Sequence, residues 1–137
     1  MRDSVAITIP SNPRYLSVVR AVSARMAEIS GMTAADVESL RLAVDEACSN
    51  VIKYSYQGDL DRRIVVRFRI ARTFFEVVID DNGVKADAAA MRGRDLADIR
   101  PGGLGIHLIH RAFDSVSFDE RKKKGNRLRM RKHRART

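Results

Sequence analysis

Apolar residues recur at helical spacing through residues 40–56, LRLAVDEACSNVIKYSY, and this pattern predicts the central helix of the chain. The apolar stripe of that helix consists of Leu40, Val44, Ala47, Cys48 and Val51. Side chains four residues apart lie on the same helix face, so Glu46 and Asn50 are expected to project side by side. Lys53 continues their polar ridge, and the helix should end near Tyr54.

Three helices, the central one included, and five strands follow from the whole pattern, because alternating apolar residues predict strands and apolar residues three or four apart predict helices. The strands are expected at about residues 5–9, 64–70, 74–80, 115–118 and 127–131, and the helices at about 13–30, 33–54 and 104–113. Residues 86–91 are expected to form a short helix and residues 92–100 a mobile loop. The order predicts an α+β fold, a two-layer sandwich with helices on one face of a mostly antiparallel sheet.

Length and composition place the chain among globular proteins. It has 137 residues, 45% of them hydrophobic, which suffices for one domain spanning residues 1–137. No apolar run approaches the roughly 20 residues that cross a bilayer, and the N-terminal MRDSVAIT lacks the apolar core of a signal peptide. The single cysteine excludes an internal disulfide, so we expect a reducing cytoplasm and no membrane contact.

Positive charge is concentrated in the C-terminal strand and tail, residues 121–137. Ten of the 26 Lys and Arg residues follow Glu120, where no acid occurs, so the remaining 16 nearly balance the 17 acids. Arg127, Arg129 and Arg131 should share one face of an edge strand, where charge prevents pairing between sheets. The alternative is a basic patch for an acidic partner or nucleic acid, although we expect no direct nucleic-acid binding.

Three stretches carry possible chemistry, and each has a purely structural alternative. An acid beside an amide, as at Glu46 and Asn50, can hold a hydrated cation or take a proton, or can simply form a solvated helix face. Asp81 at a strand end can accept a hydrogen bond from a purine amino group, or can belong to a turn. Residues 102–105, GGLG, can expose amides to phosphate at a helix start, or form a glycine-rich turn.

The three stretches together indicate one kind of fold more specifically than any one of them does alone. Their order along the chain resembles the ATP-binding (Bergerat, or histidine-kinase-like) fold shared by gyrase B, the heat-shock 90 chaperones, histidine kinases and MutL. Within that fold, AVDEACSNVIKYSY and GGLGIHLIHRAFDSV resemble the bacterial anti-sigma-factor serine kinases. The resemblance extends from the first strand to about Lys132.

The resemblance implies a role for each residue of the helix and strand end. Glu46 would be the general base that polarises the attacking hydroxyl, and Asn50 would coordinate Mg²⁺. Lys53 would lie near the phosphates. Asp81 would bind the adenine amino group, and Gly83 would leave room for the ring.

The glycine-rich stretch would bind the phosphates of ATP. Gly103 and Gly105 would offer amides to them, with Gly102 and Leu104 in the same binding loop. Arg100 would contact the terminal phosphate, and the preceding loop would act as a lid.

The resemblance further implies an ATP-binding anti-sigma factor and protein serine kinase. It would sequester a sigma factor as a homodimer and phosphorylate a serine of a small STAS-type anti-anti-sigma protein. The exposed Arg14 and Arg20 of the first helix would belong to a partner surface. Two alternatives are a binding-only switch without phosphate transfer and a nucleic-acid-binding module that uses the basic tail.

Three positions depart from the family pattern. Lys85 stands where relatives usually have a second glycine, and Tyr54 stands where they often have histidine. The last turn reads Gly125-Asn126-Arg127 in place of Gly-Asn-Thr or Gly-Thr.

Overall fold

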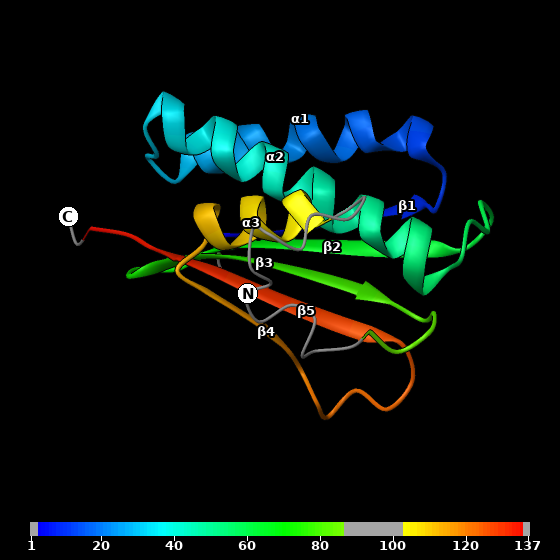
Figure 1. Cartoon of the computed structure of the whole chain (residues 1–137). Coiled ribbons are helices and arrows are strands. Elements are labelled where there is room, and N and C mark those ends of the chain that lie inside the picture. Colours follow the sequence, from blue (N-terminus) through cyan, green and yellow to red (C-terminus); the bar gives the residue numbers. More distant parts are fainter. Residues whose placement is uncertain (1–2, 87–102, 136–137) are drawn as a thin grey trace.

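The computed structural model describes residues 3–86 and 103–135, which form one sheet with helices on a single face (Figure 1). The strands are β1 (Ser4–Pro10), β2 (Arg63–Ile70), β3 (Phe74–Asp81), β4 (Ser115–Phe118) and β5 (Asn126–His133). The α-helices are α1 (Leu16–Ile29), α2 (Ala34–Asn50) and α3 (Gly103–Ala112), with a 3₁₀ turn η1 (Pro13–Tyr15) and a π-helical segment η2 (Val51–Ser55).

The sheet has the strand order β1-β2-β3-β5-β4, and every neighbouring pair is antiparallel. This arrangement confirms the predicted α+β fold with helices on one face of an antiparallel sheet.

The predicted helix at 86–91 and loop at 92–100 lie outside the described residues, apart from residue 86, as do Arg100 and Gly102. Within the described part, no helix is long and apolar enough to cross a membrane.

The predicted stripe of the central helix forms the middle of the core. All five of its residues are buried, and α2 packs against α1 and α3 in the helical layer. Ile64, Val66 and Phe68 of β2, which alternate with exposed or half-buried residues, are fully buried beneath this layer. Burial raises the pKa of the Cys48 thiol to about 12, so this cysteine is a core residue rather than a nucleophile.

Local caps explain where the 3₁₀ turn η1 and the helix α2 begin. The Thr33 hydroxyl accepts a hydrogen bond from the Asp36 amide at 3.2 Å, as the capping spacing predicts. Asn12 caps the 3₁₀ turn in the same way. Ser11 is buried instead, and its hydroxyl donates to the Asp59 carbonyl and accepts from the Arg62 amide.

The predicted helix ends earlier as an α-helix than its periodicity indicates. After Asn50 the backbone widens into π geometry, with the Tyr56 amide bonding to the Val51 carbonyl five residues back at 2.9 Å. This wider turn buries Ser55 and the ring of Tyr56 while Lys53 remains exposed. The distortion therefore turns the end of the helix toward the end of β3.

The last strand is not at an edge of the sheet. Arg127, Arg129 and Arg131 do share one face, as predicted, but β5 lies between β3 and β4. Their charges are paired within the sheet: Glu76 lies 2.6 Å from Arg131 and 3.5 Å from Arg129, and Asp80 lies 2.7 Å from Arg127. The prediction that these arginines protect an edge is wrong, because periodicity does not reveal which strand lies on the other side.

Candidate functional site

The polar ridge of α2 places an acid and an amide one turn apart. Glu46 and Asn50 are both half-buried, and Lys53 is exposed beyond them. Burial raises the pKa of the Glu46 carboxyl, the positive charge of Lys53 opposes this shift, and the negative charge of Asp45 adds to it. A raised pKa brings a carboxylate nearer to the basicity that proton abstraction needs at neutral pH.

The side-chain oxygen of Asn50, Oδ1, is buried, and it accepts no hydrogen bond within the part of the chain that the structure describes. Leaving a buried carbonyl oxygen without a partner costs about 1–3 kcal/mol. Amide oxygens are among the ligands that Mg²⁺ accepts, so this unpaired atom fits the predicted magnesium ligand.

Asp81 ends β3 with its carboxylate held by two neighbours. The residue is 3% exposed, and its Oδ1 atom accepts a hydrogen bond from the Gly83 amide at 2.9 Å. The side-chain amide of Asn126, directly opposite on β5, donates to Oδ1 at 3.1 Å and lies 3.2 Å from Oδ2. The predicted purine-binding carboxylate is therefore fixed by the protein itself.

Two glycines allow the backbone to close around Asp81. A Cβ atom at Gly83 would lie 2.2 Å from the Ser55 carbonyl oxygen, and one at Gly125 would lie 2.0 Å from the Asp81 carbonyl oxygen. The next amide, that of Val84, donates to the same Ser55 carbonyl at 2.7 Å. A side chain at position 83 would therefore collide with the π-helical segment η2. This is a second reason for glycine at this position, besides the room it would leave for an adenine ring.

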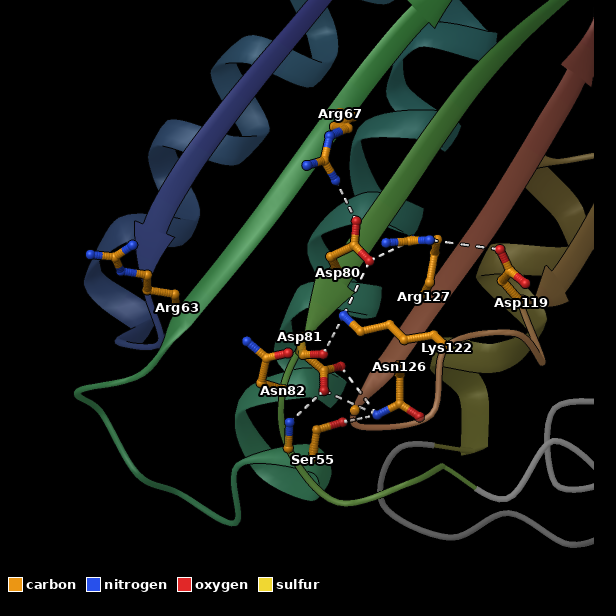
Figure 2. A network of polar contacts seen from close by, with 12 residues as sticks. Ser55, Arg63, Arg67, Asp80, Asp81, Asn82, Asp119, Lys122, Asn126 and Arg127 are labelled. Carbon is orange, nitrogen blue, oxygen red and sulfur yellow. Dashed lines mark hydrogen bonds and ion pairs between the residues drawn. The ribbon is translucent and has the colours of Figure 1, made fainter.

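The adjacent Asp80 carries a separate ion-pair network on the other face of the sheet (Figure 2). Its carboxylate accepts from Arg67, from Arg127 at 2.7 Å and from Lys122 at 3.2 Å. Lys122 also donates to the carbonyl oxygen of Asp81 at 2.7 Å. The two neighbouring acids at this strand end therefore have different partners. The Asp80 carboxylate pairs with lysine and arginine side chains, whereas the Asp81 carboxylate accepts hydrogen bonds from amide groups.

Lys85, the departure from the expected second glycine, is directed to the turn that precedes β5. Its Nζ atom donates to the carbonyl oxygens of Lys122 and, at 2.9 Å, Gly125. The lysine therefore fastens two loops together through backbone carbonyls. The ammonium group of Lys85 is engaged in these two hydrogen bonds. The nearby Asp81 carboxylate keeps its hydrogen bond from the Gly83 amide.

The predicted phosphate loop leads into α3. Gly103, Leu104 and Gly105 form the first turn of that helix, which packs against α2. The first amides of a helix lack intrahelical partners and point outward from its N-terminus, so they can bind an anion. The other two predicted residues of this loop, Arg100 and Gly102, lie outside the described range.

Several residues of the site were not predicted. The sequence places Asn126 in the last turn with no role at the site, yet it is 4% exposed and contacts both Asp81 and Ser55. Nothing in the sequence pattern indicates a role for Tyr56, yet its hydroxyl accepts from the Asn82 amide at 2.9 Å. The one available signal for Asn126 was its place in the last turn, beside the departure at Arg127, because nothing in local periodicity distinguishes a buried asparagine from one in a loop.

Known proteins are similar in sequence to this chain over most of its length. Residues 9–132 match the model of the histidine kinase-like ATPase domain family. A serine-protein kinase RsbW of Listeria innocua is 32% identical over 130 residues, which cover 88% of this chain and 83% of the relative. The RsbW kinase of Bacillus subtilis is 28% identical over 123 residues, or 83% of this chain and 76% of that protein.

A solved structure is similar in fold. It contains the RsbU and RsbW domains of a Mycobacterium tuberculosis protein, and it aligns with 97% of this chain and 33% of its own at a TM-score of 0.65. Only 15% of the aligned residues are identical, so this likeness concerns the arrangement of helices and strands.

Proposed function

This chain belongs to the histidine kinase-like ATPase family and is related to the RsbW serine-protein kinases, and on that premise we propose that it is an ATP-dependent protein serine kinase. We propose that ATP and Mg²⁺ bind between the polar ridge of α2, the end of β3 and the first turn of α3. The proposed serine belongs to a small anti-anti-sigma protein, and the kinase itself is proposed to sequester a sigma factor as a homodimer.

The pairing of Glu46 with Asn50 carries the proposal. A half-buried carboxylate with a raised pKa stands one helical turn from a buried amide oxygen without a hydrogen-bond partner among the described residues. A solvated helix face needs neither feature, since water would satisfy the amide and keep the pKa of the acid at its usual value. Both features are what a base and a metal ligand require.

Each residue has a separate task in the proposed transfer. The serine oxygen of the substrate forms a bond to the terminal phosphorus of ATP while the bond to the departing ADP oxygen breaks. Glu46 accepts the hydroxyl proton, and Asn50 binds the Mg²⁺ ion that neutralises phosphate charge. Asp81 accepts a hydrogen bond from the adenine amino group, and the amides of Gly103 and Gly105 bind phosphate oxygens.

The proposed partner surface includes η1 and the start of α1, with one change from the sequence-based expectation. Arg14 is exposed, whereas Arg20 is half-buried and forms a 2.7 Å ion pair with Asp45 of α2. Tyr15 and Val18, which are 38% and 45% exposed, add apolar contact area near Arg14. Arg20 is thus better explained as a link between the two helices.

Incubation with labelled ATP, Mg²⁺ and candidate antagonists tests the proposal. We expect label on a serine of one antagonist, detected as phosphoserine, and no label without Mg²⁺. Calorimetry with ATP and Mg²⁺ tests binding separately. If ATP binds but no antagonist is ever labelled, the binding-only switch replaces the kinase.

A further inference from the structure

We propose that Asn126 is a positioning residue that orients the Asp81 carboxylate toward the amino group of a bound adenine. The inference rests on the ATP binding proposed above and concerns how the same site recognises its base. It arises from the contacts of one buried side-chain amide at the start of β5, which are drawn in Figure 2.

Asn126 and Asp81 are a directly opposed cross-strand pair. The Nδ2 atom of Asn126 lies 3.1 Å from Oδ1 and 3.2 Å from Oδ2 of the carboxylate, so it contacts both oxygens. Oδ1 also accepts from the Gly83 amide at 2.9 Å. Oδ2 accepts only the longer bond from Asn126 among the described residues, and it is therefore the oxygen with capacity left for a ligand donor.

The orientation of the Asn126 amide is fixed at both of its ends. Its Nδ2 atom faces four oxygen acceptors, the others being Ser55 Oγ at 3.1 Å and the Val84 carbonyl at 2.9 Å. Its Oδ1 atom accepts from the Ala86 amide at 2.7 Å. A flipped amide would place its oxygen against these acceptors and lose the Ala86 bond, so the side chain has one favoured orientation.

Two lysines hold the surrounding backbone. Lys122 donates to the Asp81 carbonyl at 2.7 Å, and Lys85 donates to the carbonyl of Gly125, the residue before Asn126, at 2.9 Å. Gly125 itself approaches so closely that a Cβ atom would overlap the Asp81 carbonyl. The segments that carry the Asn126 amide and the Asp81 carboxylate are therefore fixed relative to each other. Such fixed geometry is what a preorganised hydrogen-bond acceptor requires.

The test compares ATP with purine riboside triphosphate, which lacks only the exocyclic amino group. Calorimetry with Mg²⁺ should show that the wild-type chain binds ATP roughly tenfold more tightly than the analogue, as expected for one hydrogen bond to a charged group. Asp81→Asn should reduce that preference. If the wild type binds neither nucleotide, the proposed function itself is wrong and this inference fails with it.

Asn126→Ala should lower ATP affinity roughly tenfold while changing affinity for the analogue by less than about twofold, because only ATP uses the oriented carboxylate. Asn126→Val also lacks the donor but suits a strand position, so it should give the same selective loss and provides a second variant if the alanine chain does not fold. Asn82→Ala removes an exposed side chain at the same strand end and should leave the preference unchanged. Equal losses for both nucleotides, or an unchanged preference, would mean that Asn126 only maintains the loop and would overturn the proposal.

Discussion

Lys122 and Asp80 form an ion pair of 3.2 Å that joins the turn before β5 to the end of β3. Both side chains are largely buried, at 16% and 9% exposure, whereas the arginines that also contact Asp80 are more open to water. Because Lys122 also donates to the Asp81 carbonyl, the pair couples the outer face of the sheet to the strand end that carries the candidate site.

Asp80→Asn should therefore destabilise the fold. The substitution leaves Lys122 and Arg127 without their charged acceptor, and we expect the free energy of unfolding to fall by about 1–3 kcal/mol. Urea denaturation at neutral pH measures this change. Glu38→Gln, which removes an exposed pair with Arg41, is the control and should leave stability nearly unchanged; equal effects of the two substitutions would contradict the structural role of Asp80.

Glu46→Ala should separate catalysis from binding. A general base acts in the transition state, so phosphate transfer should slow by about 10²–10⁴-fold while the ATP dissociation constant stays within a small factor of wild type. Rates with labelled ATP and calorimetry provide the two measurements. Glu38→Ala on the same helix should leave both unchanged, and wild-type transfer rates in Glu46→Ala would show that Glu46 is not the base.

Phosphate transfer should depend on pH through Glu46. Because burial raises the pKa of this carboxyl, lowering the pH protonates the base earlier than for an ordinary glutamate and slows the reaction. Lys53 opposes that shift, so Lys53→Met should raise the pKa and move the acid limb of the rate profile to higher pH. Rates should be measured at saturating ATP, since Lys53 is also a proposed phosphate contact.

Lys123→Met supplies the matched control for that profile, because Lys123 is an exposed lysine of the turn before β5. Its acid limb should coincide with that of the wild type. An acid limb that moves to lower pH in Lys53→Met would contradict the electrostatic relation between Lys53 and Glu46.

Gly83→Ala should disturb the site through the helix end. The added Cβ atom would lie 2.2 Å from the Ser55 carbonyl, so either the loop after β3 or the π segment must move. We expect weaker ATP binding and a lower melting temperature, measured by calorimetry and thermal denaturation. Normal ATP affinity in this variant would show that the close approach at Gly83 is not needed for the pocket.

The basic tail should not make this chain a specific DNA-binding protein. The β5 arginines are paired with Glu76 and Asp80, and we expect DNA binding no tighter than about 10⁻⁴–10⁻⁶ M at physiological salt. Reversing charge at Lys123 and Lys124 tests the turn, and leaves Lys122 to hold Asp80. Nanomolar, sequence-selective binding that this double variant abolishes would require a nucleic-acid function.

Features that depend on local periodicity could be predicted from the amino-acid sequence. The buried stripe of α2, the Thr33 cap and the alternation of β2 follow from spacing alone, because each helix or strand must turn one apolar face toward a core. The ridge of Glu46 and Asn50 follows for the same reason. Those local rules also gave the helices-on-sheet architecture, since the order of elements leaves few compact alternatives.

Which distant segments meet could be known only from the folded chain. The tertiary structure placed β5 inside the sheet, paired Arg20 with Asp45, and brought Asn126 to Asp81 across 45 positions of sequence. Contacts of this kind depend on register and on which strands become neighbours, and a two-residue alternation is the same for an edge strand and an inner one. The buried amide beside the candidate purine-binding carboxylate could therefore be recognised only once β3 and β5 were aligned.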